Sequence, residues 1–469
     1  MAMSISSKPL EDSPPAQAST QNSGRPEQVP IPRGRGLVTS IGPGLVLAMT
    51  FLGTGDLVSS SVSGASYGYA LLWTLVLSLI ARTFIISTIA KYTLMNRHGD
   101  SQILDGFARI TPVLPGIMAV VVIIAGFVTQ ATFLRAAAAG LYELTGGGWG
   151  GAWGTFICAI IVATFTLFVV TRKKQFTFLE YFARVASVLM IGAFIYALFK
   201  IGHFDVGGFF RGMAFEMPAN DGGGAFAPIV IAAATIGTIA GNMPNLLYSG
   251  FMKDKGWVGP RYRRLQQLDL FAGMAPLLVI NLLFWVVAAE FSRNNPGFNI
   301  ANEHDLSQML TMAVGTAGPF LLWLCIFLAA MTSFPPQSRG FAQLTINGLN
   351  HAVPAWRKYL GRDEENPAFR VIQILIFIVV PLAASLPGAP NFVAMNIVGT
   401  ALSTVLSLPI IVVCILLLTS SKSTCMTTQL TAGGLPFYSA YLESLLSLSA
   451  FRLQSTFQRC SRQHSEETS

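Results

Sequence analysis

The chain has 469 residues, a formal net charge of +8 and only 11% charged side chains, whereas soluble domains carry about 25%. Together with a mean hydropathy of +0.57, this composition excludes an ordinary water-soluble protein and predicts a polytopic membrane protein that lies in a lipid bilayer. The basic residues lie mostly between apolar runs, so they indicate orientation in the membrane, and we expect no nucleic-acid partner.

The two ends of the chain differ in composition from its centre. Residues 1–36 are rich in Ser, Pro and Gln without an apolar core, which predicts a disordered cytoplasmic tail and not a signal peptide. Residues 37–418 are the predicted transmembrane domain. Residues 419–469 form a tail in which Phe437–Phe457 has the pattern of an amphipathic helix. A multi-pass chain without a signal or transit peptide is expected in a bacterial inner membrane.

Ten apolar segments approach the length of about 20 residues that a membrane helix needs. Lys and Arg gather before the first segment and in the even-numbered connections, and they are scarce in the odd-numbered ones. By the positive-inside rule, this alternation places both termini in the cytoplasm and supports an even number of spans. The predicted spans are Leu37–Val62, Tyr69–Leu94, Pro112–Leu141, Gly151–Val170, Phe178–Ile201, Phe226–Gly250, Leu268–Glu290, Val314–Leu344, Phe369–Leu386 and Asn391–Leu418.

The first span is interrupted near its middle by Gly53-Thr54-Gly55-Asp56. A glycine inside a helix costs about 1 kcal/mol relative to alanine, and an aspartate in the membrane costs roughly 2.5–3.5 kcal/mol. Unwound membrane helices carry such residues because their freed carbonyls and side chains bind an ion or a polar substrate. The stretch therefore predicts a broken helix with Asp56 at a binding site.

The sixth span is broken as well, at Gly241-Asn242-Met243-Pro244-Asn245. Pro244 cannot donate a backbone hydrogen bond and disfavours helical geometry at Met243. In the eighth span, Phe334–Arg339 carries two prolines and predicts an interruption with a kink, which leaves Arg339 buried or beside an aqueous cavity.

The breaks in the first and sixth spans divide the ten spans into two sets of five, and each set begins with a broken helix. Such a pair is typical of transporters with inverted repeats. We therefore predict an all-α membrane protein, a 5+5 inverted-repeat bundle with broken first and sixth helices. Two plainer interpretations stay open: the glycines serve close helix packing, or Asp56 pairs structurally with Arg82 or Arg135. The candidate ligand residues are Asp56, Thr54, Asn242, Met243 and Asn245.

Four stretches occur in an order that resembles a known family. Gly42–Gly44 opens the first helix, Ser63–Trp73 joins the first two spans, Arg172–Glu180 enters the fifth, and Ala342–Leu349 ends the eighth. Together they resemble the Nramp family of divalent metal transporters over roughly residues 42–418. The resemblance implies a LeuT-type fold and a divalent metal ion as substrate.

The chain departs from this family at the signatures themselves. The first-helix signature is Asp-Pro-Gly-Asn, whereas Gly53–Asp56 has its carboxylate at the fourth position. The sixth-helix signature, Met-Pro-His-Asn, aligns in two ways, with Asn245 at the His or at the Asn, and the first is preferred. Gln130 takes the place of a third-helix glutamate. The resemblance therefore does not extend to proton coupling, and the histidines fall in predicted loops or the tail: His98, His203, His304, His351 and His464.

The predicted site is rich in oxygen, with one carboxylate, amides, a hydroxyl and carbonyls. Such a site suits Mg²⁺ or Mn²⁺, and the sulfur of Met243 would favour Mn²⁺, Fe²⁺ or Cd²⁺. The ion is substrate, and no resident cofactor is expected. A single acid predicts weak binding, because the other acids lie near the ends of the spans: Glu143, Glu180, Asp269 and Glu290.

The leading hypothesis is a secondary transporter that moves a divalent metal cation of the Mn, Fe or Mg class by alternating access. The alternative is a Na⁺-coupled symporter of an amino acid or small organic solute on the same fold, with the half-helix that begins near Leu57 holding the solute's carboxylate. No HExxH or P-loop motif is present, so we do not expect an enzyme. A scaffold that has lost transport is the third hypothesis. The oligomeric state is not predicted.

Overall fold

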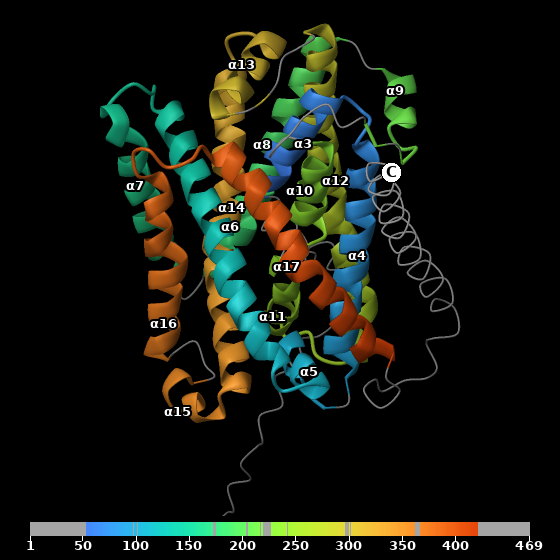
Figure 1. The fold of residues 1–469 in the computed structure, drawn as a ribbon, viewed down its shortest axis with the longest axis vertical. Helices are drawn as coiled ribbons and strands as arrows, with labels where there is room; N and C mark the ends of the chain where they lie inside the picture. Colours follow the sequence, from blue (N-terminus) through green and yellow to red (C-terminus); the bar gives the residue numbers. More distant parts are fainter. Residues whose placement is uncertain are drawn as a thin grey trace, which may run out of the picture.

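The computed structural model describes residues 53–96, 98–100, 102–171, 175–202, 205–215, 217–218, 227–241, 243–295, 300, 302–361 and 366–420. Every regular element of these residues is a helix, and the long helices form one bundle (Figure 1). The principal elements are α3 (Thr54–Tyr67), α4 (Leu72–Met95), α5 (Ile103–Ile110), α6 (Leu114–Leu144), α7 (Gly154–Val170), α8 (Gln175–Ile201), α9 (Val206–Arg211), α10 (Pro228–Ile239), η3 (Met243–Leu247), α11 (Tyr248–Asp254), α12 (Arg263–Asn294), α13 (Glu303–Val314), α14 (Gly318–Ala352), α15 (Arg357–Leu360), α16 (Pro367–Ile374), η6 (Leu375–Val379), η7 (Val380–Ser385) and α17 (Phe392–Ser420).

Each of the ten predicted spans overlaps a helical element. Among the described residues, seven helical runs are long and apolar enough to cross a membrane, judged by length and composition. Two shorter apolar helices, Gly154–Val170 and Val188–Lys200, lie in the predicted fourth and fifth spans. Only the second half of the first span is described, as α3. The predicted tails, including Phe437–Phe457, lie outside the described residues.

The sixth-helix break is present, and the described part of the first span begins at its predicted break. α3 begins at Thr54, and the preceding Gly53 has an extended backbone with φ −76° and ψ 169°. α10 ends at Ile239, and the chain resumes as the short 3₁₀ helix η3, which contains Pro244, before α11 continues. The breaks lie where Gly and Pro weaken helical hydrogen bonding. Asn242 lies outside the described residues.

The predicted interruption of the eighth span is wrong, because α14 continues through Pro335 and Pro336 as one helix. Prolines inside a membrane helix are tolerated where neighbouring helices pack against it, and α14 packs along α6. The hydroxyl of Ser338 donates to the carbonyl of Pro335 at 2.7 Å, as a serine inside a helix commonly does. Arg339 is half-buried. Since α14 extends to Ala352, beyond the predicted end at Leu344, His351 lies on its last turn and not in a loop.

Close helix contacts set the shape of the bundle. α14 packs along α6, α12 against α3, and α10 against α17. At the contact of α3 with α12, a Cβ atom on Gly64 would lie 2.5 Å from the carbonyl oxygen of Trp285. Glycine is therefore required there, because only a residue without a side chain lets the two backbones approach so closely.

The connections of the bundle separate by charge. Figure 1 shows α5 and α15 at one end and α9 and α13 at the other. Arg109, Lys253 and Arg357, from the second, sixth and eighth connections, line one cavity. These three basic connections therefore lie at the same end, as the alternation of charge predicts. Which end faces the cytoplasm stays a prediction.

Candidate functional site

Asp56 lies in the first turn of α3 and is only 2% exposed. Its backbone N–H donates to the carbonyl of Gly53 at 3.1 Å, which closes the first turn after the break. Asp56 and Thr238 of α10 line the same small cavity. A carboxylate at a helix N-terminus is favoured by the partial positive charge of the unpaired N–H groups. The break thus places one acid inside the bundle, between the first and sixth helices.

A cavity of about 20 Å³ adjoins Asp56. This volume has room for about one water molecule or one bare ion. Phe133 of α6 closes it toward the break, since a Cβ atom on Gly53 would meet the Phe133 ring at 2.4 Å. Four helical segments form its walls, with the residues Gly53, Gly55, Asp56, Val128, Thr129, Thr132, Phe133, Gly237, Thr238, Asn396, Gly399, Thr400 and Ser403.

Side chains satisfy carbonyl groups at both breaks. The amide of Asn396 donates to the carbonyl of Gly55 at 3.3 Å. At the sixth-helix break, Ser407 donates to the carbonyl of Gly241 at 2.6 Å, and Asn245 donates to that of Ala240 at 2.8 Å. Unwound backbone is stable inside a membrane protein only when its polar groups find such partners. These carbonyls are therefore held by the protein in this conformation.

Arg82 of α4 is the basic group beside Asp56. Its side chain is fully buried, its Nη1 lies 3.9 Å from Oδ2 of Asp56, and its Nε donates to Oδ1 of Asn245 at 3.3 Å. Of the two structural pairings that the sequence left open for Asp56, the structure contains the one with Arg82. Arg135 instead lies 3.7 Å from Glu303 and donates to the carbonyl of Ala384.

The structure describes three of the other predicted ligand residues, Thr54, Asn245 and Met243. Thr54 is fully buried at the start of α3, and its hydroxyl has no hydrogen-bond partner among the described residues. Asn245 contacts the site through Arg82. Met243 is 1% exposed on η3 and does not line the cavity of Asp56. The structure therefore brings Asp56 and Asn245 to one guanidinium, with Thr54 two residues before Asp56 in the chain.

Sequence reasoning missed the contribution of α17. Asn396, Thr400, Ser403 and Ser407 follow one another at spacings of four, three and four, so they share one face of the helix. Three of them line the cavity, and Ser407 bonds the sixth-helix break. This polar stripe in an otherwise apolar span was the signal that would have identified the helix.

Two acids that the sequence placed near the ends of a span are buried. Asp269 is fully buried and Glu290 is 1% exposed, both on α12. Glu290 accepts hydrogen bonds of 2.7 Å from the Tyr69 hydroxyl and from the backbone of Asp205. Neither acid lines the cavity beside Asp56, so Asp56 is the one carboxylate among the described lining residues.

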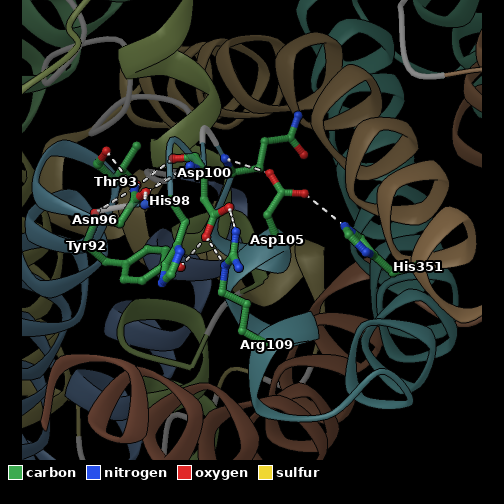
Figure 2. Close-up of polar contacts among 9 residues, drawn as sticks. Tyr92, Thr93, Asn96, His98, Asp100, Asp105, Arg109 and His351 are labelled. Atoms are coloured by element: carbon green, nitrogen blue, oxygen red, sulfur yellow. Dashed lines mark hydrogen bonds and ion pairs between the residues drawn. The ribbon is translucent and has the colours of Figure 1, made fainter. Parts of the chain in front are cut away.

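A second, larger cavity of about 550 Å³, here called the vestibule, lies between α5, α11, α14 and α15. Figure 2 shows His351 of α14 reaching toward Asp105 of α5, and the Nε2 to Oδ1 distance is 2.9 Å. Asn347 of α14 donates to Gln102, one turn away from that pair. Polar side chains of α5 and α14 thus face each other across the vestibule wall.

An ion pair closes the loop between α4 and α5. Asp100 accepts two hydrogen bonds of 2.7 Å from Arg109 and one of 2.6 Å from the Tyr92 hydroxyl (Figure 2). Burial by itself raises the pKa of Asp100, but the hydrogen bonds from Arg109 and Tyr92 and the charge of Arg109 outweigh burial and hold this pKa below its ordinary value. The folded protein therefore stabilises the ionised form of Asp100 more than the unfolded chain does.

We expect Asp100→Asn to lower the thermal unfolding midpoint at pH 7 by an amount equivalent to about 1–2 kcal/mol, since Arg109 is partly exposed and screened by solvent. Because the folded pKa is lowered, the stabilisation is fully present above the unfolded value of about 3.9 and is lost as the pH falls through the folded pKa. The difference in unfolding midpoint between wild type and Asp100→Asn, measured in detergent at pH 7 and pH 3, should therefore be smaller at pH 3. An equal difference at both pH values would contradict the assignment.

Comparisons with known proteins agree with this architecture. The family described as natural resistance-associated macrophage protein-like (Nramp) matches residues 44–435. The divalent metal cation transporter MntH of Deinococcus radiodurans is 25% identical over 353 residues, which cover 73% of this chain and 76% of the relative. Two crystal structures of the Eremococcus coleocola manganese transporter, one of a variant and one of a complex with an aromatic bis-isothiourea substituted compound, superpose with TM-scores of 0.56 at 16% identity. They cover 84% and 83% of this chain, and 96% and 88% of their own chains.

Proposed function

The chain belongs to the Nramp family, and from that premise we propose that it moves a divalent metal cation across a lipid bilayer by alternating access. One observation carries the proposal. Asp56 is a buried carboxylate at the start of a half-helix, beside a cavity the size of a single ion. Half-helix termini that meet inside a bundle are the usual place for a transported ion. The transport unit proposed here is residues 37–418, with residues 1–36 and 419–469 as tails.

Asp56 is the main ligand in this proposal, and Thr54 contributes its buried hydroxyl. Asn245 and Met243 do not line the cavity in this conformation; in this proposal they add an amide oxygen and a sulfur from the second break when the metal is bound. Asn242 is the further candidate from the sequence. Oxygen ligands alone suit Mg²⁺ and Mn²⁺ alike, whereas a thioether selects against Mg²⁺. The proposed preference is therefore for Mn²⁺ and similar transition-metal ions over Mg²⁺.

The vestibule is proposed as the cytoplasmic mouth of the ion's path. Basic residues of three connections line it, and such residues favour the cytoplasmic side of a membrane. The same wall carries Asp100, Asp105 and His351, so a hydrated cation meets carboxylates as well as basic groups there. This orientation places both termini in the cytoplasm, as proposed from the distribution of charge.

Uptake into proteoliposomes tests the function. Purified protein is reconstituted, Mn²⁺ is added outside, and internal Mn²⁺ is followed with a trapped fluorescent indicator. We expect time-dependent Mn²⁺ uptake above that of protein-free vesicles, with competition by Cd²⁺ stronger than competition by an equal concentration of Mg²⁺. Uptake of amino acids that requires Na⁺, with no response to divalent ions, would instead support a symporter of organic solutes. Well-folded protein that moves neither would contradict transport.

A further inference from the structure

Arg82 is a fully buried arginine in the interior of α4, a predicted membrane span. Charged side chains inside a membrane are costly and generally act in ion pathways or as partners of other charges. The guanidinium of Arg82 contacts Asp56 of the first-helix break and Asn245 of the sixth-helix break. One cation of the protein therefore lies between the two breaks that define the site.

This guanidinium carries a positive charge and contacts two of the oxygen atoms that a bound metal ion would coordinate. Its Nη1 lies 3.9 Å from the carboxylate of Asp56, and its Nε donates a hydrogen bond to Oδ1 of Asn245. Asp56 is only 2% exposed. Asp56 and Arg82 together carry no net charge. A second cation that approaches Asp56 in this arrangement is not attracted by the net charge of the pair, which is zero. At short range the arginine repels this cation, and the low polarity of the surroundings strengthens the repulsion.

We propose that Arg82 is a tethered counter-ion that competes with the transported metal for Asp56 and Asn245. In the absence of metal it neutralises the buried carboxylate and links the two breaks. Metal binding requires the guanidinium to move away, which exposes both oxygen ligands together. A divalent ion competes against the single charge of Arg82 better than a monovalent ion does, so Arg82 determines specificity for divalent ions at the expense of affinity. This inference rests on the proposed function.

Calorimetric titration of purified protein with Mn²⁺ tests the competition. We expect Arg82→Ala to bind Mn²⁺ roughly tenfold more tightly than wild type, because the competing charge is removed. Arg82→Lys, which keeps a cation in place, should stay close to wild type. The matched control is Arg263→Ala, since Arg263 donates hydrogen bonds to the Ser87 carbonyl and to Gln266; its affinity should equal that of wild type.

Free guanidinium provides a second, chemically specific measurement. In Arg82→Ala, the space left by the side chain admits guanidinium, so guanidinium chloride at low concentration should weaken Mn²⁺ binding more than NaCl of equal ionic strength. Wild type should respond equally to both salts. If Arg82→Ala does not yield folded protein, Arg82→Gln replaces it, because glutamine is uncharged and keeps an N–H donor on its side chain.

The outcomes separate this inference from the proposed function. Tighter Mn²⁺ binding by the uncharged variants than by wild type supports competition. Mn²⁺ binding that is measurable in these variants but not in wild type supports it as well. Equal or weaker binding by folded Arg82→Ala or Arg82→Gln, with measurable binding by wild type, overturns the competition and leaves the proposed function intact. The absence of Mn²⁺ binding in wild type and in every folded variant overturns the proposed function itself, and with it the role of Arg82.

Discussion

Asp56→Asn is expected to reduce Mn²⁺ uptake by about 100-fold, because the amide keeps the shape of the side chain and removes the charge that holds the ion. Among the described residues, no other carboxylate lines the cavity that could take its place. The variant also leaves Arg82 without its counter-charge inside the bundle, so we expect a lower thermal unfolding midpoint as well. Uptake into proteoliposomes and melting curves in detergent measure the two effects separately.

The double variant Asp56→Asn with Arg82→Gln separates loss of the ligand from loss of stability. It removes both charges, so its unfolding midpoint should lie closer to that of wild type while its uptake stays low. Asp205→Asn serves as the matched control. Asp205 does not line the cavity, and its Oδ2 lies 2.9 Å from Nη1 of Arg293. The uptake of this variant should be unchanged. Full uptake by folded Asp56→Asn would remove Asp56 from the site.

Gly237→Ala is expected to be severely disruptive although it adds one methyl group. A Cβ atom at this position would lie 1.9 Å from the Thr404 hydroxyl and 2.3 Å from the Thr400 carbonyl oxygen of α17. The carbonyl belongs to the backbone, so α10 and α17 must move apart. Forcing extra volume into such a contact costs about 1–3 kcal/mol. Since both helices form walls of the cavity, we expect a lower unfolding midpoint together with lost uptake.

The corresponding substitution on α8, Gly192→Ala, is the control for Gly237→Ala. No atom lies within 4 Å of the Cβ position at Gly192. Alanine is about 1 kcal/mol more favourable than glycine inside a helix, so this variant should be as stable as wild type or more stable. The two substitutions are chemically identical, and opposite signs would show that helix packing decides the effect. A harmless Gly237→Ala would contradict the close contact of α10 with α17.

Features that depend on neighbouring residues could be predicted from the sequence. Glycines before Asp56 and the proline at 244 weaken helical hydrogen bonding within one turn. α3 begins at the predicted position, and the sixth helix is broken at the segment that contains Pro244. The same rule failed for α14, which continues through Pro335 and Pro336. Proline removes a backbone donor wherever it occurs, but the packing of neighbouring helices decides whether the helix continues, and α14 packs along α6.

Features that depend on which faces of distant helices meet were decided by the tertiary structure. The sequence left Asp56 with Arg82, Arg135 or an ion as its partner, and only the packing of α3 against its neighbours placed Arg82 beside it. His351 reached the vestibule because α14 extends past its predicted end. The sequence alone thus determined that the chain is an all-helical membrane protein with two predicted helix breaks and one acid at the first of them, because local composition controls insertion and helix breaking. The rotation and separation of the packed helices decided the partners of that acid, because a contact between residues far apart in the chain has no local energetic signature.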